Sequence, residues 1–249
     1  MQTKRRIAIV GGCGGIGRAL VSACLETMNQ VAVLDLKSSA QRHPAPKEAH
    51  YLEIDVLDRN SVFSAFADLS KLWYGLDGLV NLSGFMADMA PILETDASDI
   101  GETIEGNLIS AFSIVQAAHP LLKNGVSPVI VQTSSGLAAF TRPQYGSYAA
   151  AKAGLISLTK TLAIEWAPDI RVNAVAPGAI DTAFLRGGTG RSPENQPTSL
   201  DIPQYEASIP LKRIGTPGDV IGPILFLLGE ESAYMTGQVL WVNGGAYMP

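Results

Sequence analysis

The chain has 249 residues, of which 47% are hydrophobic and 16% are charged. That composition is typical of a globular protein, and the length suits one large domain or two small ones. A net charge of −5 without a basic stripe argues against a nucleic-acid partner, and the apolar runs are too short to span a membrane. Cys13 and Cys24 form neither a disulfide framework nor a zinc pattern, so we expect no metal and a reducing, cytoplasmic setting.

The N-terminal stretch predicts a nucleotide-binding loop. Residues 7–10 are all apolar, as in a buried parallel strand. Five glycines follow within Gly11–Gly17, and a helical pattern then runs from Ile16 to about Met28. A strand, a glycine turn and a helix in this order let backbone N–H groups approach a pyrophosphate at the positive end of the helix. A flexible glycine turn is the alternative interpretation.

A carboxylate ends the second expected strand, residues 31–35. Asp35 lies 18 residues after Gly17, near the distance at which an acidic residue accepts the hydroxyls of an adenosine ribose. The same carboxylate would repel a 2′-phosphate, so the sequence favours NAD over NADP. The alternative is that Asp35 is only a strand-end turn residue.

The remaining chain alternates strands with helices. Lys37 to Glu48 contains two prolines, which predict a loop with at most one short turn. Further strands are expected at residues 51–56, 79–81, 129–133, 171–176 and 239–242, and helices at 58–71, 96–122 (interrupted or bent), 147 to near 168, and 217–228. The alternation predicts an α/β fold with one Rossmann-type domain over residues 1–249. Its doubly wound parallel sheet would have about seven strands flanked by helices.

Three side chains predict a proton-transfer site. Tyr148 and Lys152 are four residues apart, so on a helix they lie on one face. The strand at 129–133 delivers Ser134 and Ser135 at its carboxyl end, where ligands of parallel sheets bind. A free phenol has a pKa of about 10, and a neighbouring ammonium is expected to lower it. Taken alone, a Tyr-x3-Lys pair is also typical of a solvated helix face.

Together these motifs resemble the short-chain dehydrogenase/reductase family over nearly the whole chain. The family's glycine loop is matched by residues 10–17, with Val10 in place of threonine, and its adenine-contacting pair by Asp55-Val56. Its Asn-Asn-Ala-Gly motif reads Asn81-Leu82-Ser83-Gly84 here, so the second asparagine is lost. The segments 177–182 and 236–245 are similar to its later signatures.

The resemblance implies a role for each polar residue of the site. Tyr148 is then the general acid/base, and Ser135, 13 residues before it, holds the same substrate oxygen. Lys152 lowers the pKa of Tyr148 and holds the nicotinamide ribose, and Asn107 supports a proton-relaying water. The implied cofactor-binding residues are Gly11, Gly12, Cys13, Gly14, Gly15, Ile16, Gly17, Asp35, Asp55, Val56, Asn81, Ser83, Gly84, Tyr148, Lys152, Pro177, Gly178, Ile180 and Thr182.

The function implied is hydride transfer between NAD(H) and a small secondary alcohol or ketone, in a homotetramer or homodimer. A non-catalytic NAD-binding sensor or scaffold on the same fold is the alternative. An enoyl reductase is disfavoured, because that relative usually spaces its tyrosine and lysine more widely.

A substrate lid is expected at residues 183–209, which we call the lid. Three glycines, Pro193, Pro197 and Pro203 are expected to break regular structure there. Arg186 and Arg191 have two interpretations: both are solvated, or one of them binds an anionic group of the substrate. The expected substrate-contacting residues are Met86, Leu137, Phe140, Tyr145, Phe184, Arg186 and Arg191.

Overall fold

A seven-stranded parallel sheet forms the centre of the protein, in the order β3-β2-β1-β4-β5-β6-β7. The computed structural model describes residues 4–27, 29–86, 89–188, 190–198 and 200–248. The strands are β1 (Arg6–Val10), β2 (Gln30–Asp35), β3 (His50–Glu53), β4 (Gly78–Asn81), β5 (Val129–Thr133), β6 (Arg171–Pro177) and β7 (Val239–Val242). This confirms the predicted single-domain α/β fold.

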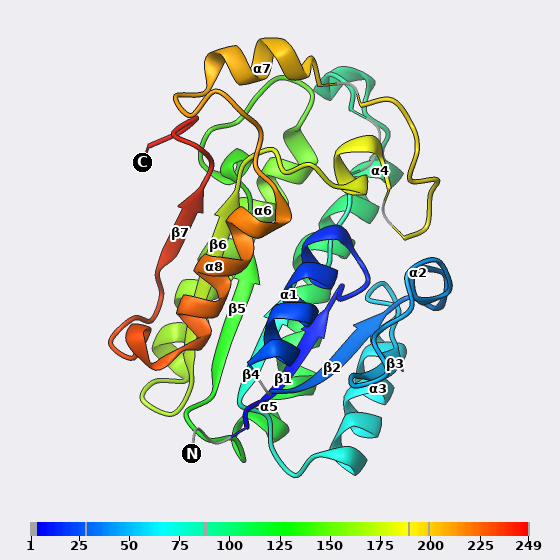
Figure 1. Ribbon diagram of the computed structural model, residues 1–249. Helices are drawn as coiled ribbons and strands as arrows, with labels where there is room; N and C mark the ends of the chain where they lie inside the picture. Colours follow the sequence, from blue (N-terminus) through cyan, green and yellow to red (C-terminus); the bar gives the residue numbers. More distant parts are fainter. Residues whose placement is uncertain (1–3, 28, 87–88, 189, 199, 249) are drawn as a thin grey trace.

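Helices connect the strands and cover both faces of the sheet (Figure 1). They are α1 (Gly15–Glu26), α2 (Lys37–Arg42), α3 (Arg59–Leu72), α4 (Ala97–Ile104), α5 (Ser110–Leu122), α6 (Gly146–Glu165), α7 (Ile202–Ser208) and α8 (Pro217–Leu228). No helix of the described residues is both long enough and apolar enough to cross a membrane.

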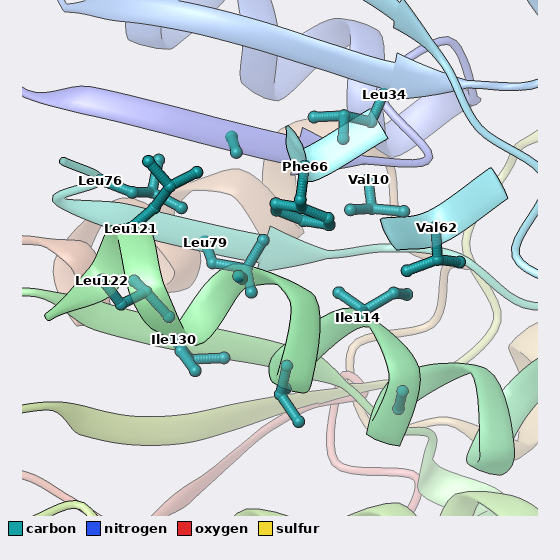
Figure 2. Packing of buried hydrophobic residues seen from close by; sticks show 14 of the residues in the cluster. Val10, Leu34, Val62, Phe66, Leu76, Leu79, Ile114, Leu121, Leu122 and Ile130 are labelled. Atoms are coloured by element: carbon teal, nitrogen blue, oxygen red, sulfur yellow. The ribbon is translucent and has the colours of Figure 1, made fainter. Parts of the chain in front are cut away.

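Two hydrophobic cores lie on opposite faces of the sheet. Ala8 and Val10 of β1 belong to the core that includes residues of α3, α5 and α6, part of which is shown in Figure 2. Ile7 and Ile9, whose side chains alternate with those two, belong to the core shared with α1 and α8. The uninterrupted apolar run of this strand follows from burial on both faces.

The chain reverses its winding between β1 and β4. It runs outward from β1 to β3 on one side, then returns to β4 on the other side of β1. Such a switch point opens a crevice beyond the carboxyl ends of the strands, where ligands of α/β sheets bind. The lid, which includes α7, lies at this end of the sheet (Figure 1).

Several expected boundaries need correction. β3 ends at Glu53, so Asp55 and Val56 lie beyond the strand. The expected loop after Lys37 begins with the six-residue helix α2, and Pro203, expected to break structure, lies in the first turn of α7, where its missing N–H does no harm. Met28, the expected end of the first helix, lies outside the described residues.

One interruption was predicted correctly. Residues 96–122 form α4 and α5 joined by a π-helical turn at Glu105–Ile109, which contains Asn107. Single π turns inside helices are frequent at functional sites. The irregular turn therefore marks Asn107 as a residue to follow into the site.

Candidate active site

A continuous cavity at the switch point joins the glycine loop to Tyr148. Its nucleotide-facing end is lined by the glycine loop, Asp35 and Val56, and its other end by Ser135, Tyr148 and aromatic side chains. The residues expected to touch cofactor and those expected to touch substrate thus share one space.

The glycine loop leads into an open helix end. Gly14 is the N-cap of α1 and has no side chain to satisfy the first N–H groups, and the first turn has no acidic residue. A Cβ at Gly17 would lie 2.3 Å from the carbonyl oxygen of Gly11, so only glycine lets the helix pack against its own loop. The N–H groups and the helix dipole are left for an anion, which fits the pyrophosphate of a dinucleotide.

Asp35 lies at the end of β2, and its carboxylate accepts hydrogen bonds from two backbone N–H groups and from the side chains of Ser39 and Cys13. Its Oδ2 accepts from the Cys13 N–H and its Oδ1 from the Leu36 N–H, both at 2.8 Å. Burial raises the pKa of this carboxyl above its ordinary value, against the effect of those hydrogen bonds. No ion pair with Asp35 occurs among the described residues. The remaining lone pairs of the carboxylate are available to hydroxyl donors in the cavity.

Tyr148 is buried on the first turns of α6 and is hydrogen-bonded to the side chain of Ser135. The neighbouring Ser134 is used differently, because its hydroxyl donates to the Lys152 carbonyl at 2.8 Å. The structure therefore separates the two serines, with Ser135 facing the phenol. Burial raises the pKa of Tyr148, and the hydrogen bond with Ser135 acts against this rise.

Lys152 is a buried ammonium beside the phenol. Its Nζ donates to the Thr133 carbonyl at 2.9 Å and lies 5.6 Å from the centre of the Tyr148 ring. Burial lowers the pKa of Lys152 to about 8, so the charged form still predominates at neutral pH. The sequence predicted a lowered pKa for Tyr148, and this prediction was wrong, because burial raises the pKa. Any lowering of the pKa by Lys152 has to act against the effect of burial.

Asn107 has one unsatisfied buried atom. Its Nδ2 donates to the carbonyl oxygens of Phe85 (2.7 Å) and Thr103 (2.8 Å), while its Oδ1 has no partner among the described residues. A Cβ at Gly84, where φ is +150°, would lie 2.4 Å from this Oδ1 and 3.1 Å from Lys152 Nζ. Only glycine leaves this gap open, and a buried acceptor facing an ammonium across it suits a bridging water.

The comparisons with known proteins agree with this geometry. A family model described as "Enoyl-(Acyl carrier protein) reductase" matches residues 11–247. A short-chain type dehydrogenase/reductase of Sinorhizobium fredii, y4vI, described as uncharacterised, is 34% identical over 98% of this chain. The chain belongs to the short-chain dehydrogenase/reductase family. It spans only 44% of that relative's length.

Two further similarities cover whole chains. The 3-oxoacyl-[acyl-carrier-protein] reductase FabG of Thermotoga maritima is 34% identical over 95% of this chain and 95% of its own. The solved structure of Thermoplasma acidophilum aldohexose dehydrogenase, ligand-free, has a TM-score of 0.87 at 27% identity, covering 99% of this chain and 96% of the other. Members of the short-chain dehydrogenase/reductase family are oxidoreductases that bind a nicotinamide cofactor.

Most of the predicted site residues line the cavity of this short-chain dehydrogenase/reductase. Of the cofactor set, the lining includes Gly11, Cys13, Gly14, Gly15, Ile16, Gly17, Asp35, Val56, Ser83, Gly84, Tyr148, Lys152, Pro177, Gly178, Ile180 and Thr182. Of the substrate set, it includes Met86, Leu137, Phe140, Tyr145, Phe184 and Arg191. Their contacts with cofactor or substrate stay predictions.

Five predicted residues do not line the cavity, namely Gly12, Asp55, Asn81, Asn107 and Arg186. The Asn81 side chain is engaged inside the protein, with its Nδ2 donating to Gln132 and its Oδ1 accepting from Ser83. Gly12 has no side chain, and a Cβ there would press on Val33. Asn107 faces the gap beside Lys152 with its unsatisfied Oδ1.

The two lid arginines both have carboxylate partners. Arg186 pairs with Asp181 at 2.5 Å and does not line the cavity, and its substrate contact stays a prediction. Arg191 pairs with Asp55, the carboxylate expected at the adenine. The sequence could not anticipate this pair, because 136 residues separate its members.

The lid covers both ends of the cavity. Phe184 lies with its ring centre 6.2 Å from that of Tyr148, as expected of an apolar roof. Farther along, the side chain of Glu194 bonds His43 at 2.7 Å, and the carbonyl of Gly190 accepts from Ser38. The middle of the lid is thus attached to α2 at the nucleotide end, which the sequence did not indicate.

Sequence reasoning missed several side chains that line the cavity, among them Arg18, Arg142, Tyr205 and Tyr247. Tyr247 stacks on Phe140, with ring centres 5.6 Å apart. Arg142 was within reach of sequence reasoning, because it lies between Ser135 and Tyr148 and only three residues before Tyr145. The described residues contain no group of three or more His, Cys, Asp or Glu placed to hold a metal.

Proposed function

We propose that this short-chain dehydrogenase/reductase transfers a hydride between NAD(H) and a secondary alcohol or ketone, with Tyr148 as general acid/base. The observation that carries the proposal is the hydrogen-bonded pair of Ser135 and Tyr148 in a cavity continuous with the glycine loop and Asp35. When bound, the nicotinamide supplies the hydride donor or acceptor. The protein's residues supply orientation and proton transfer.

In the oxidative direction a secondary alcohol and NAD⁺ give a ketone, NADH and one proton. Ser135 holds the hydroxyl oxygen, and Tyr148 takes the hydroxyl proton as the hydride leaves the carbinol carbon. Because burial opposes the phenolate, the Lys152 ammonium beside the ring has to favour it. The proton then leaves through the gap between Lys152 and the unsatisfied Oδ1 of Asn107. Ketone reduction runs through the same residues in reverse.

We propose NAD rather than NADP because of the charge at the ribose end. Asp35 lines the cavity and has backbone N–H groups but no cation as partners. Arg18 and Arg191 also line the cavity, but each is engaged: Arg18 donates to the Cys13 carbonyl, and Arg191 pairs with Asp55. A 2′-phosphate would meet the Asp35 carboxylate and would have to recruit one of these arginines from its partner.

A second candidate is reduction of a carbon–carbon double bond, because the matching family model is described as an enoyl-(acyl carrier protein) reductase. The spacing of three residues between Tyr148 and Lys152 favours carbonyl chemistry instead, as does the similarity to a 3-oxoacyl reductase. The non-catalytic alternative is disfavoured, since a sensor has no need of a buried Ser135–Tyr148–Lys152 arrangement beside the cofactor loop.

The remaining parts of the proposal concern assembly and location. Short-chain dehydrogenases/reductases are typically oligomeric, and we propose a homotetramer or homodimer here. Exposed apolar side chains at the start of α5, Ile109 and Phe112, support self-association. We propose a cytoplasmic location, which two buried free cysteines support.

The test is a screen of secondary alcohols with NAD⁺ and NADP⁺, and of the matching ketones and 2-enoyl thioesters with the reduced cofactors. We expect turnover of alcohols and ketones, with a higher kcat/KM for NAD. Turnover confined to the enoyl compounds would favour the second candidate. Cofactor binding without any turnover across the screen would favour the sensor.

A further inference from the structure

A strained turn leads into the catalytic helix. The Tyr145 N–H bonds the Arg142 carbonyl at 3.4 Å, Pro143 is the second residue, and Gln144 has φ +74°. These are the features of a type II turn, in which the third position normally takes glycine or asparagine. A glutamine there is strained, because an L side chain disfavours a positive φ. The turn fixes where Arg142 and Tyr145 project, immediately before Tyr148.

Both side chains of this turn reach the cavity, and a lid residue meets them there. Arg142 is half-buried, and its guanidinium carbon lies 5.0 Å from the ring centre of Tyr205 on α7. The charge of Arg142 and the phenol of Tyr205 both act on the pKa of Tyr145, although burial is the main cause of its rise. Arg142, Tyr145 and Tyr205 therefore form one group, which we call the Arg142 cluster.

Among the cavity's cations, the Arg142 guanidinium makes no hydrogen bond or ion pair with another described residue, whereas each of the others makes at least one. Lys152 donates to Thr133, Arg18 to Cys13, and Arg191 pairs with Asp55. No carboxylate is paired with Arg142 in the part of the chain that the structure describes. A half-buried guanidinium that packs on a ring and has N–H groups without acceptors suits an anionic ligand.

We propose that the Arg142 cluster binds a carboxylate on the substrate, so that the preferred substrates are hydroxy acids and oxo acids rather than neutral alcohols and ketones. The inference rests on the proposed function, because it assigns the substrate class of that same cavity. The guanidinium gives bidentate donors, and the two phenols add O–H donors. Leu137, Phe140 and Phe184 form apolar walls for the carbon chain between the carboxylate and Tyr148.

The experiment compares oxo acids with their methyl esters in wild type, Arg142→Gln and Arg142→Lys. The carboxyl carbon of each acid lies one, two or three carbons from the ketone. We expect wild type to favour one acid over its ester. Arg142→Gln should lower the acid-to-ester ratio of kcat/KM by about 10- to 100-fold, mainly through KM, since a hydrogen bond to a charged group is lost. Arg142→Lys should restore part of the ratio.

Arg59→Gln is the matched control. Its guanidinium also lies over a ring, 4.6 Å from the centre of Phe63, but on the surface of α3 and outside the cavity. The acid-to-ester ratio should not change in this variant. A wild type that favours every ester, or an Arg142→Gln that keeps the wild-type ratio, would overturn the inference and leave the proposed hydride transfer standing.

A binding measurement keeps the inference testable even if no pair is turned over, which would count against the proposed function instead. Calorimetric titration of the NADH-loaded enzyme with butanoate and with butanamide reports carboxylate recognition without chemistry. We expect butanoate to bind wild type in preference to butanamide, and Arg142→Gln to lose that preference. Equal affinity of wild type for the two compounds would contradict a carboxylate site.

Discussion

Asp77 and Asp35 are carboxylates at opposite ends of the same parallel sheet, and their surroundings differ. Asp77 precedes β4 at the amino end and is 2% exposed. It accepts from Arg6 side-chain nitrogens at 2.7 and 3.0 Å and from the N–H groups of Arg6 and Val126. Burial alone would raise the pKa of Asp77, but these partners outweigh burial and hold it below the ordinary value.

Asp35, at the carboxyl end, has no such cation, and burial raises its pKa. Lys152 and Tyr148 at the same end are likewise shifted toward their uncharged forms by burial. The comparison separates the end of the sheet that stabilises the fold from the end that binds ligands. The amino end satisfies its charges internally, while the carboxyl end keeps buried polar groups that are incomplete without a ligand.

The largest expected effect comes from the carboxyl end. Tyr148→Phe removes the exchangeable proton and should lower kcat by about 10² to 10⁴-fold. NADH binding, followed by fluorescence titration, should persist, because the glycine loop and Asp35 are untouched. Tyr234→Phe, at a fully exposed tyrosine outside the cavity, is the control and should be neutral. More than about a tenth of wild-type turnover in Tyr148→Phe would show that the acid/base is another group.

The amino end should affect stability instead. Asp77→Ala leaves the partly buried Arg6 without its carboxylate and should lower the free energy of unfolding by about 3 kcal/mol in denaturant titration. Its kcat per folded molecule should match wild type. Asp68→Ala breaks the exposed pair with Lys71 and should cost under about 1 kcal/mol. Equal losses in the two variants would remove the basis of the comparison.

The pH dependence sharpens this second prediction. Because the pKa of Asp77 is lowered from 3.8 in the folded protein, its stabilisation is present above that value and is lost as the pH falls through the folded pKa. The difference in unfolding free energy between wild type and Asp77→Ala should therefore shrink in acid below about pH 4. A difference that stays constant down to the acid transition would speak against ionised Asp77 as its source.

The choice between NAD and NADP tests the role of Asp35, the carboxylate without an ion-pair partner among the described residues. Asp35→Ala should reduce kcat/KM for NAD by roughly 10- to 100-fold, because charge-assisted hydrogen bonds to the ribose are lost, and should narrow the margin over NADP. A wild type that uses both cofactors equally would contradict the role given to Asp35.

The smallest effect is expected in the lid. Arg191→Gln breaks an exposed pair with Asp55 and should change the KM for NAD by less than about fivefold. Arg213→Gln, which breaks the exposed pair with Asp219 outside the cavity, should leave that KM unchanged. A rise of about 20-fold or more in Arg191→Gln would mean that this guanidinium binds the cofactor directly.

Local spacing explains why part of the site could be predicted from the sequence. The glycine loop and the Tyr148–Lys152 pair depend on neighbours within a few residues, and Ser135 follows from the end of a strand. The doubly wound parallel sheet follows from the alternation of strands and helices. These features were expected from the sequence, and the structure brings them together in one cavity.

The missed features depend on the path of the lid through space. The contact of Arg142 with Tyr205 and the pairing of Asp55 with Arg191 join segments that are far apart in the chain. The sign of the Tyr148 pKa shift was also out of reach, because it is set by burial under many side chains rather than by the neighbouring Lys152. Spacing in a sequence carries no information on burial of this kind.

The central claim is hydride transfer from or to the cofactor with Tyr148 as general acid/base, and transfer of an isotope label tests this claim most directly. NADH deuterated on the transferring face of nicotinamide C4 is incubated with a ketone that the enzyme turns over, and the product is analysed by mass spectrometry. For wild type we predict an alcohol carrying one deuterium on the carbinol carbon, with one cofactor oxidised for each alcohol formed. Tyr148→Phe should form the same labelled alcohol at a rate lower by orders of magnitude. Unlabelled alcohol, or labelled alcohol formed equally fast by Tyr148→Phe, would contradict the account.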